Sequence, residues 1–579
     1  MITQLKHIAT IFLLGCFTSC SNVLETDDLQ NYSPDNVWND ENLSEAYLAN
    51  LYSLSFSGWP VNSGKYADET AGILGHDYVM PNNDNFKYWP YDKIYKINIM
   101  IEGLEQGHIN DDIKKKMLGE AIFLRAYHYF KALIYHGGIP YITKVQEEGK
   151  DDLYVHRNTS AECFDFLVQD LNKAIELLPE HNTGRDYGHI DASAALALKA
   201  KVLLYKASPQ FNPKSGYKNK YVDEAFIANK EAYETLLSRG YGLVDDYTSV
   251  FETKGHKEAV IAVIYNNPNK LDGRNEQTCR PLSQSKDNTG GDQAIWDLIE
   301  AYPMKDGKKI GESDKYHYDI QTYWKNRDPR FEASQVWNGS IFELSNIQGR
   351  RQYTVFNIAS LDDMFCSSRE NSYARTGFFP RKGIMESNTR PEVRNNDFDW
   401  LEMRFAEVMF NYAEIACAKG NTEIGYDILK QIRKRAGIEP GEDNMYGLKS
   451  GMNTDEMRTA LLEEKRIEFV FENQRFWDLR RNRCLYLING ICKYGLEGTY
   501  KGEITSEVQK KANNYELLPE DFTYQVKEVI STGQGSDRET SMWIPESYYF
   551  FPIKQSSIEQ NGNLEQNVDW GGNFNPSLE

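Results

Sequence analysis

The sequence predicts a mostly α-helical protein built from short helical hairpins that stack as tetratricopeptide repeats do. Amphipathic segments recur on both sides of the chain's middle, each with apolar residues at helical spacing. One segment, 191–207, is crowded with alanine, which lets neighbouring helices pack closely. Residues 266–400 show only weak periodicity, and the tail from residue 539 is irregular. We therefore expect a repeat scaffold with a large irregular, loop-rich insertion and a wrapping C-terminal tail.

Apolar spacing and stop signals place the individual elements along the chain. Gly137, Gly138 and Pro140 should end a long helix, and Asp191 is the expected N-cap of the alanine-rich one. Residues 57–90 are rich in Gly, Pro and Asn and are predicted to form loops. A short apolar run at 259–265 predicts a strand. The expected helices are 42–54, 119–135, 164–178, 191–207, 222–237, 401–418, 423–436 and 455–471.

The N-terminus predicts export and a lipid anchor. Lys6 precedes an apolar stretch of about ten residues, which suits a signal peptide and is too short to span a bilayer. Thr18 and Ser19 lead directly to Cys20, whose thiol can be diacylated before cleavage. We expect Cys20 to be the lipidated first residue of the mature protein. Cys16 is a competing site, and an ordinary secretory signal is the alternative.

These signals divide the chain into five expected segments. Residues 1–19 form the signal peptide and 20–40 the leader that follows the lipid anchor. Residues 41–240 hold the N-terminal helical repeats, and 241–400 form the irregular region that faces the ligand. Residues 401–579 hold the last helical repeat and the tail.

Composition excludes several classes of partner. The formal net charge of −20 argues against nucleic acid, which requires clustered Lys and Arg. Eight cysteines without CxxC pairs and ten histidines without a His-Glu-x-x-His pattern predict neither a metal site nor a cofactor. The chain has 37 Tyr and 10 Trp, which suits the binding of sugar faces, although large secreted domains also use aromatic residues in the core.

Several short motifs are spread over the chain. They include GEAIFLRAY at 119–127, NRDPRF at 326–331, IRKRAG at 432–437 and FENQRFWDLR at 471–480. The other stretches are 20–26, 135–140, 302–307, 404–408, 411–414, 464–468, 551–553 and 563–567. Taken together and in this order, they resemble the SusD/RagB family of Bacteroidetes outer-membrane lipoproteins.

The resemblance implies a tetratricopeptide-like superhelix with a less regular face for ligand. It also implies a SusC-like TonB-dependent β-barrel transporter in the outer membrane, over which the protein sits as a hinged lid on the cell surface. Members of this family commonly bind oligosaccharides, some relatives handle peptides, and they are not catalysts. We therefore expect a glycan-binding lipoprotein that delivers oligosaccharide to its transporter.

Charged residues of the C-terminal motifs are predicted to be structural. A catalytic pair formed by Glu464 and Glu468 is the alternative, because a glycosidase works with two carboxyl groups. Carboxylates four residues apart on one helix are, however, ordinary members of ion-pair networks. The residues expected in buried charge networks are Glu464, Arg466, Glu468, Arg475, Asp478 and Arg480.

Ligand residues are predicted from chemistry, because the family's motifs do not contain them. Sugar capture favours aromatic platforms beside amide and guanidinium groups. The alternative to a ligand role for Trp89 is a role in packing. Trp296 is expected in the core. The predicted ligand residues are Trp59, Tyr78, Asn82, Asn85 and Trp89 in the first loop region, and Arg274, Trp324 and Trp337 in the irregular region.

Three rival functions are left open. A secreted α-helical glycoside hydrolase predicts sugar release and paired carboxylates on loops. A protein of the same fold with peptide cargo predicts an extended acidic or apolar cleft. A pure assembly scaffold predicts no small ligand.

Overall fold

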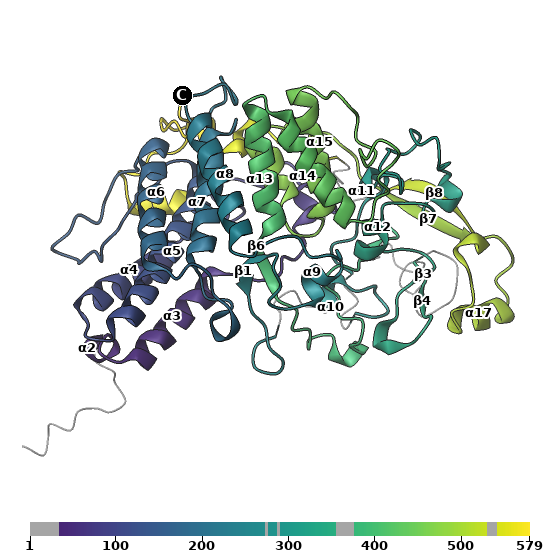
Figure 1. Ribbon diagram of the computed structural model, residues 1–579, viewed down its shortest axis with the longest axis horizontal. Helices are drawn as coiled ribbons and strands as arrows, with labels where there is room; N and C mark the ends of the chain where they lie inside the picture. Colours follow the sequence, from purple (N-terminus) through teal and green to yellow (C-terminus); the bar gives the residue numbers. More distant parts are fainter. Residues whose placement is uncertain (1–33, 272–275, 286–289, 355–375, 530–540) are drawn as a thin grey trace, which may run out of the picture.

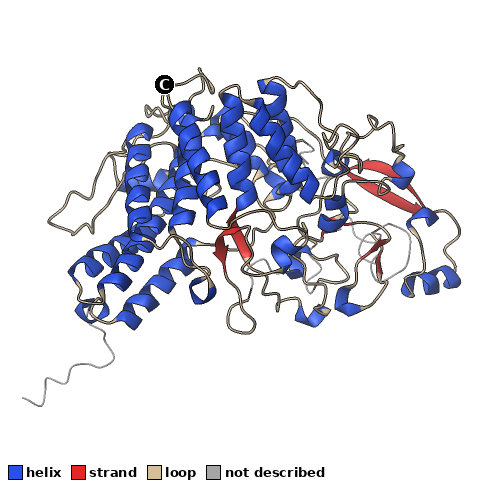
Figure 2. Ribbon diagram, in the orientation of Figure 1, coloured by secondary structure: helices blue, strands red, loops and turns tan. Residues whose placement is uncertain are grey.

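The computed structural model describes residues 34–271, 276–285, 290–354, 376–529 and 541–579. Helices dominate it, and its strands are short and occur in two-stranded pairs (Figure 2). The predicted mostly helical fold class is confirmed. Within these described ranges, no helix is both long enough and apolar enough to cross a membrane.

The helices form one continuous superhelix. Each packs against the next in the order given below, and α8 lies directly beside α13 although 166 residues separate them (238 to 405). The irregular region therefore interrupts the scaffold in sequence but not in space (Figure 1). The successive helices are α3 (Glu41–Ser55), α4 (Tyr91–Gln106), α5 (Asp111–His136), α6 (Ser160–Leu177), α7 (Ala192–Ala207), α8 (Val222–Ser238), α13 (Phe405–Ala418), α14 (Thr422–Arg435) and α15 (Thr454–Glu468).

Local sequence signals explain where these helices begin and end. The Asp191 side chain accepts a hydrogen bond of 2.8 Å from the Ala194 N–H and so caps α7 as predicted. Gly137 ends α5 with a φ of 79°, a conformation that favours glycine. A Cβ at this position would lie 2.3 Å from Pro576 Cβ, so the same glycine lets the C-terminal tail pass closely.

Three predicted helix boundaries are wrong. Helix α5 begins at Asp111, eight residues before the predicted start at 119. Residues 401–404 belong to a strand, β6 (Trp400–Arg404), which pairs antiparallel with β1 (Ala259–Val263), and α13 begins only at Phe405. Pairing with β1 overrides the helical spacing because it satisfies the buried backbone groups of both segments. Helix α15 ends at Glu468 rather than 471, and Phe471 has a φ of 62°.

The irregular region and residues 494–528 fill the other side of the molecule. Short helices and strand pairs gather there, with the β7–β8 hairpin and α17 at its edge (Figure 1). Its helices are α9 (Ser249–Glu252), α10 (Glu276–Cys279), α11 (Trp296–Ala301), α12 (Pro329–Ser334) and α17 (Ser506–Asn513). Its strand pairs are β2 (Gln335–Val336) with β5 (Phe379–Pro380), β3 (Ser340–Ile341) with β4 (Arg351–Gln352), and β7 (Tyr494–Tyr500) with β8 (Phe522–Glu528).

The C-terminal tail runs over the scaffold as expected. The Phe551 N–H donates to the Tyr135 carbonyl of α5 (2.7 Å), and the Leu578 N–H donates to the Phe211 carbonyl after α7 (2.8 Å). Phe551 is fully buried in the main hydrophobic core. The remaining helices are α2 (Pro34–Val37) near the N-terminus, α16 (Arg475–Arg481) and α18 (Gln555–Gln560).

Buried ion pairs lock the C-terminal helices, as predicted. Glu468 lies between Arg404 and Arg330, and Asp68 joins Arg466 and Arg475. Arg480 differs from the prediction, because it donates to backbone carbonyls of Tyr548 and Tyr135 instead of a carboxylate. The ion pairs of these residues are Arg330–Glu464 (2.5 Å), Arg433–Glu464 (2.7 Å), Arg330–Glu468 (3.1 Å), Arg404–Glu468 (2.8 Å), Arg466–Asp68 (3.3 Å), Arg475–Asp68 (3.0 Å) and Lys465–Asp478 (2.6 Å).

Candidate functional site

The fold brings three distant loop segments together in one region, here called the loop face: residues 62–78 and 541–543, which contain its exposed and half-buried side chains, and the mostly buried residues 290–295. The Ala71 N–H donates to the Gln293 carbonyl (2.8 Å), and the Ile295 N–H donates to the Glu69 carbonyl (3.0 Å). The Trp543 N–H donates to the Leu74 carbonyl (2.8 Å). The first loop region and the irregular region, which the sequence singled out separately for ligand, therefore meet here.

Buried charges fasten the loop face to the scaffold. Asp68 accepts two hydrogen bonds of 3.0 Å from Arg475 of α16. The Lys493 ammonium donates to the carbonyls of Lys65 (3.1 Å) and Thr70 (2.7 Å). Burial lowers the pKa of Lys493 to about 7 and, together with the Asp68 charge, raises the pKa of Glu69 to about 8. These buried contacts therefore hold the loop face in place on the helical scaffold.

An aromatic pair lies at the surface of the loop face. The rings of exposed His76 and half-buried Trp543 lie 4.7 Å apart at an angle of 35°. Trp543 is held from behind by Tyr548, whose ring lies 6.0 Å away. A surface ring pair with polar edges is the geometry that complements an apolar sugar face.

The predicted platforms Trp59 and Trp89 have packing contacts instead. Trp59 is only 4% exposed, lies 4.9 Å from Phe251 and 5.2 Å from Trp400, and donates its indole N–H to the Phe398 carbonyl. The expectation that Trp59 is an exposed platform is wrong. Burying its large apolar surface in the core lowers the free energy of the folded protein more than leaving it in water. Trp89 is half-buried against Tyr91, with ring centroids 4.9 Å apart.

Tyr78 and the asparagines lie near the surface of the first loop region. Tyr78 is half-buried, and its hydroxyl lies 3.4 Å from that of Tyr66. Asn85 is exposed, and its amide donates to the Tyr78 carbonyl (2.8 Å). Asn82 is also exposed. A ligand role for Tyr78, Asn82 and Asn85 stays a prediction.

The predicted aromatic residues of the irregular region pair with each other. Trp324 is half-buried and stacks on Trp337 at 5.3 Å. Trp337 is 5% exposed and donates its indole N–H to Glu332 (2.9 Å), so the surface platform expected there is wrong as well. Glu332 borders a cavity of about 650 Å³, and burial raises its pKa. Arg274 and Cys20 lie outside the described residues.

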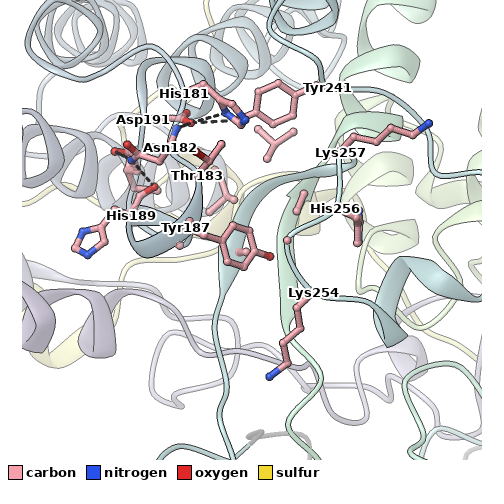
Figure 3. A pocket seen from close by; sticks show the side chains of 18 of the residues that line it. His181, Asn182, Thr183, Tyr187, His189, Asp191, Tyr241, Lys254, His256 and Lys257 are labelled. Atoms are coloured by element: carbon pink, nitrogen blue, oxygen red, sulfur yellow. Dashed lines mark hydrogen bonds and ion pairs between the residues drawn. The ribbon is translucent and has the colours of Figure 1, made fainter.

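A pocket of about 510 Å³ lies between the loop before α7 and strand β1 (Figure 3). Its polar groups mostly satisfy one another. Asp191 accepts from Tyr241 (3.1 Å) and the Asn182 N–H (3.0 Å), and the Tyr241 hydroxyl lies 2.8 Å from His181 Nδ1. Figure 3 shows Lys257 pointing away from this group. We infer a structural role for these contacts, which close the loop onto α7.

Sequence reasoning missed Trp543 and His76. Trp543 follows a polar, glycine-containing stretch of the tail, and a Trp in such a segment is the available signal. His76 belongs to the first loop region, but a lone histidine has no distinctive pattern. Only the contact between the tail and this loop makes them a pair.

A helical superhelix that carries an aromatic loop face defines a repeat-scaffold binding protein. The chain belongs to the SusD family, because the model described as "SusD family" matches residues 257–570. A second model, described as "Starch-binding associating with outer membrane", matches residues 26–204. The sequence-based recognition is confirmed.

Individual relatives agree with this assignment. The SusD-like protein P38 of Formosa agariphila is 22% identical over 84% of this chain and 94% of its own length. A SusD-like protein of Bacteroides fragilis has a TM-score of 0.70 at 24% identity, covering 93% of this chain and 98% of that one. A SusD-like carbohydrate-binding protein of Bacteroides fragilis has a TM-score of 0.68 at 22% identity, covering 91% and 99%.

Proposed function

We propose that this protein is a non-catalytic, lipid-anchored outer-membrane protein that captures oligosaccharides and passes them to a TonB-dependent transporter. The observation that carries the proposal is the His76–Trp543 ring pair on the loop face of a SusD-family scaffold. The similarity to a carbohydrate-binding protein of Bacteroides fragilis and the match to a family described as starch-binding support the same ligand class. The loop face, rather than Trp59 or Trp337, is the proposed capture surface.

Ion pairing of the two candidate catalytic carboxylates supports binding without catalysis. Burial alone would raise the pKa of Glu468, yet Arg435 and Arg404 hold it well below its ordinary value. Arg433 and Arg330 overcome burial in the same way and lower the pKa of Glu464. A glycosidase needs one carboxyl with a raised pKa as its acid, so this pair does not meet that requirement.

The test is isothermal titration of the soluble form beginning at Ser21 with plant, host and microbial oligosaccharides and short peptides. We expect saturable heat with one glycan class, and an affinity about tenfold weaker, or about 1.4 kcal/mol, in Trp543→Ala and His76→Ala. His108→Ala removes an exposed histidine elsewhere and should bind normally. Trp570→Ala removes another half-buried tryptophan that packs on Tyr548, and controls for disturbance of the tail.

Each other outcome has a definite meaning. Binding of peptides alone would replace the glycan cargo with peptide. Release of sugar from the panel would overturn the non-catalytic assignment. Equal glycan binding by wild type and Trp543→Ala would move the capture surface away from the loop face.

The anchor is tested separately. Cys20→Ser should abolish incorporation of labelled palmitate and release the protein from the outer-membrane fraction, because one lost thiol removes the acylation site. Cys16→Ser should leave both unchanged. Normal acylation of the Cys20→Ser protein would assign the anchor to another residue.

A further inference from the structure

A cavity of about 400 Å³ lies in the scaffold, and none of its lining residues belongs to the loop face. Helices α5 and α7, strand β6 and the start of α16 form its walls, and residues 57–61 form part of its lining. Val61 in this segment is 37% exposed, so the cavity has a side that reaches solvent. The volume is near the lower end of the range of about 300–1,000 Å³ typical of small-molecule sites.

Aromatic rings line this cavity densely. The half-buried rings of Tyr135 and Trp477 lie 4.7 Å apart at 32°, on α5 and α16. Trp59 and Trp400, 5.2 Å apart and almost fully buried, form part of the cavity wall. The half-buried rings of Tyr135 and Trp477 are available to pack against one flat apolar face of a ligand.

Both positively and negatively charged side chains line the cavity beside the aromatic rings. The Tyr127 hydroxyl donates to Glu402 and accepts from the Lys131 ammonium at 3.2 Å, so it links the two charges. The other Glu402 oxygen accepts from the Trp400 indole at 2.9 Å. Among the other charged residues of the lining, Lys201 pairs with Glu407 (2.7 Å) and Arg481 with Asp478 (3.1 Å). Glu472 pairs with Arg404, which is outside the lining (2.8 Å).

Lys131 has hydrogen-bonding capacity left over. Its ammonium carries three N–H donors, and Tyr127 supplies its one hydrogen-bond acceptor among the described residues. Its remaining described contacts are with the ring faces of Tyr88 and Tyr127, each 5.1 Å from the ammonium. Burial lowers the pKa of Lys131, and the Glu402 charge opposes that effect. An incoming hydroxyl oxygen would restore hydrogen bonds that burial has removed.

We propose that this inner cavity is a second binding site, which takes a single neutral sugar ring or a similar small polyol. Hydroxyl groups accept from Lys131 and donate to Glu402, while the ring's apolar face packs on Trp477 and Tyr135. Because four carboxylates and three cations line the cavity, it favours a neutral ligand over an anionic one. The site is distinct from the loop face, so it does not rest on the proposed capture of oligosaccharides there.

The experiment is isothermal titration of the soluble protein with neutral monosaccharides and with the corresponding uronic acids. We expect saturable binding of at least one neutral sugar, weakened about tenfold or more in Lys131→Met. Val61→Trp, at a partly exposed position, should block the cavity by size without disturbing the core. Lys434→Met changes an exposed lysine on α14 and should bind normally. Circular dichroism melting establishes that each variant is folded.

The results separate this proposal from the capture of oligosaccharides. His76→Ala and Trp543→Ala should leave monosaccharide binding intact, and Lys131→Met should leave oligosaccharide binding intact. No neutral monosaccharide binding by the folded wild-type protein would overturn the inner site while leaving the loop face untouched. Equal binding by Lys131→Met and wild type, or a preference for uronic acids, would also overturn it.

Discussion

Arg475 of α16 and Asp68 of the first loop region form two hydrogen bonds of 3.0 Å across 407 residues of sequence. Asp68 is 9% exposed and Arg475 is 4% exposed, so the pair is shielded from water. Arg466 adds a second guanidinium at 3.3 Å. This relationship holds the loop face on the helical scaffold, and it makes the position of that face depend on the C-terminal helices.

Asp68→Asn should destabilise the protein strongly. The amide keeps the size of the side chain but removes the charge that Arg466 and Arg475 share. Among the described residues, Arg475 then retains only the carboxylate of Glu463, at 3.3 Å, and the loss of the buried carboxylate costs about 3–5 kcal/mol. Urea denaturation followed by circular dichroism measures the change in the free energy of unfolding. Asp112→Asn, at a position with a 95% exposed side chain, is the control and should change it by less than about 0.5 kcal/mol. A loss below about 1 kcal/mol at Asp68 would contradict a structural role for the pair.

Stability should fall as pH drops below about 4.3, the ordinary pKa of a glutamate. Burial opposes ionisation of Glu414 and Glu468, but Arg481 and Arg435 respectively outweigh it, so both have a lowered pKa in the folded state. Groups with a lowered folded-state pKa add stability that is present above the unfolded pKa and is lost as pH falls towards the folded one. The free energy of unfolding between pH 7 and pH 3 tests this.

The contribution of one group can be isolated. In Glu414→Gln the slope of unfolding free energy against pH below about pH 4 should be smaller than in wild type, by up to about one proton, or 1.4 kcal/mol per pH unit. Identical slopes would show that Glu414 is not ionised in the folded protein under these conditions.

Trp59→Ala should cost stability, about 3–5 kcal/mol, because it empties a buried site against Phe251 and Trp400. Trp59→Phe should cost less, since it retains an aromatic ring. The melting temperature and the affinity for oligosaccharide are measured on the same samples. Unchanged stability with lost oligosaccharide affinity would restore Trp59 as a ligand platform.

Asp191→Ala should weaken the start of α7. The carboxylate caps the Ala194 N–H and also accepts from Tyr241, so its removal should cost about 1–2 kcal/mol. Thermal unfolding measures the loss, and Asp191→Asn should recover part of it because an amide oxygen also caps helices. Equal stability of Asp191→Ala and wild type would show that the loop is held by other contacts.

The sequence by itself determined the helical scaffold, the N-cap at Asp191, the glycine stop at Gly137 and the membership of Glu464, Glu468 and Arg475 in buried charge networks. These features depend on apolar spacing, local backbone chemistry and the high cost of burying an unpaired charge, all of which are visible in a linear chain. It also singled out both loop regions that meet at the loop face.

Only the tertiary structure decided which aromatic residues reach the surface. Trp59 and Trp337 lie among turns in sequence but are buried, because segments far along the chain cover them. His76 and Trp543 are 467 positions apart and form a surface pair only because the tail hydrogen-bonds to Leu74. In the same way, residues 401–404 became a strand because β1 lay beside them. Long-range contacts fix burial and strand pairing, and no local pattern encodes which distant segment will supply them.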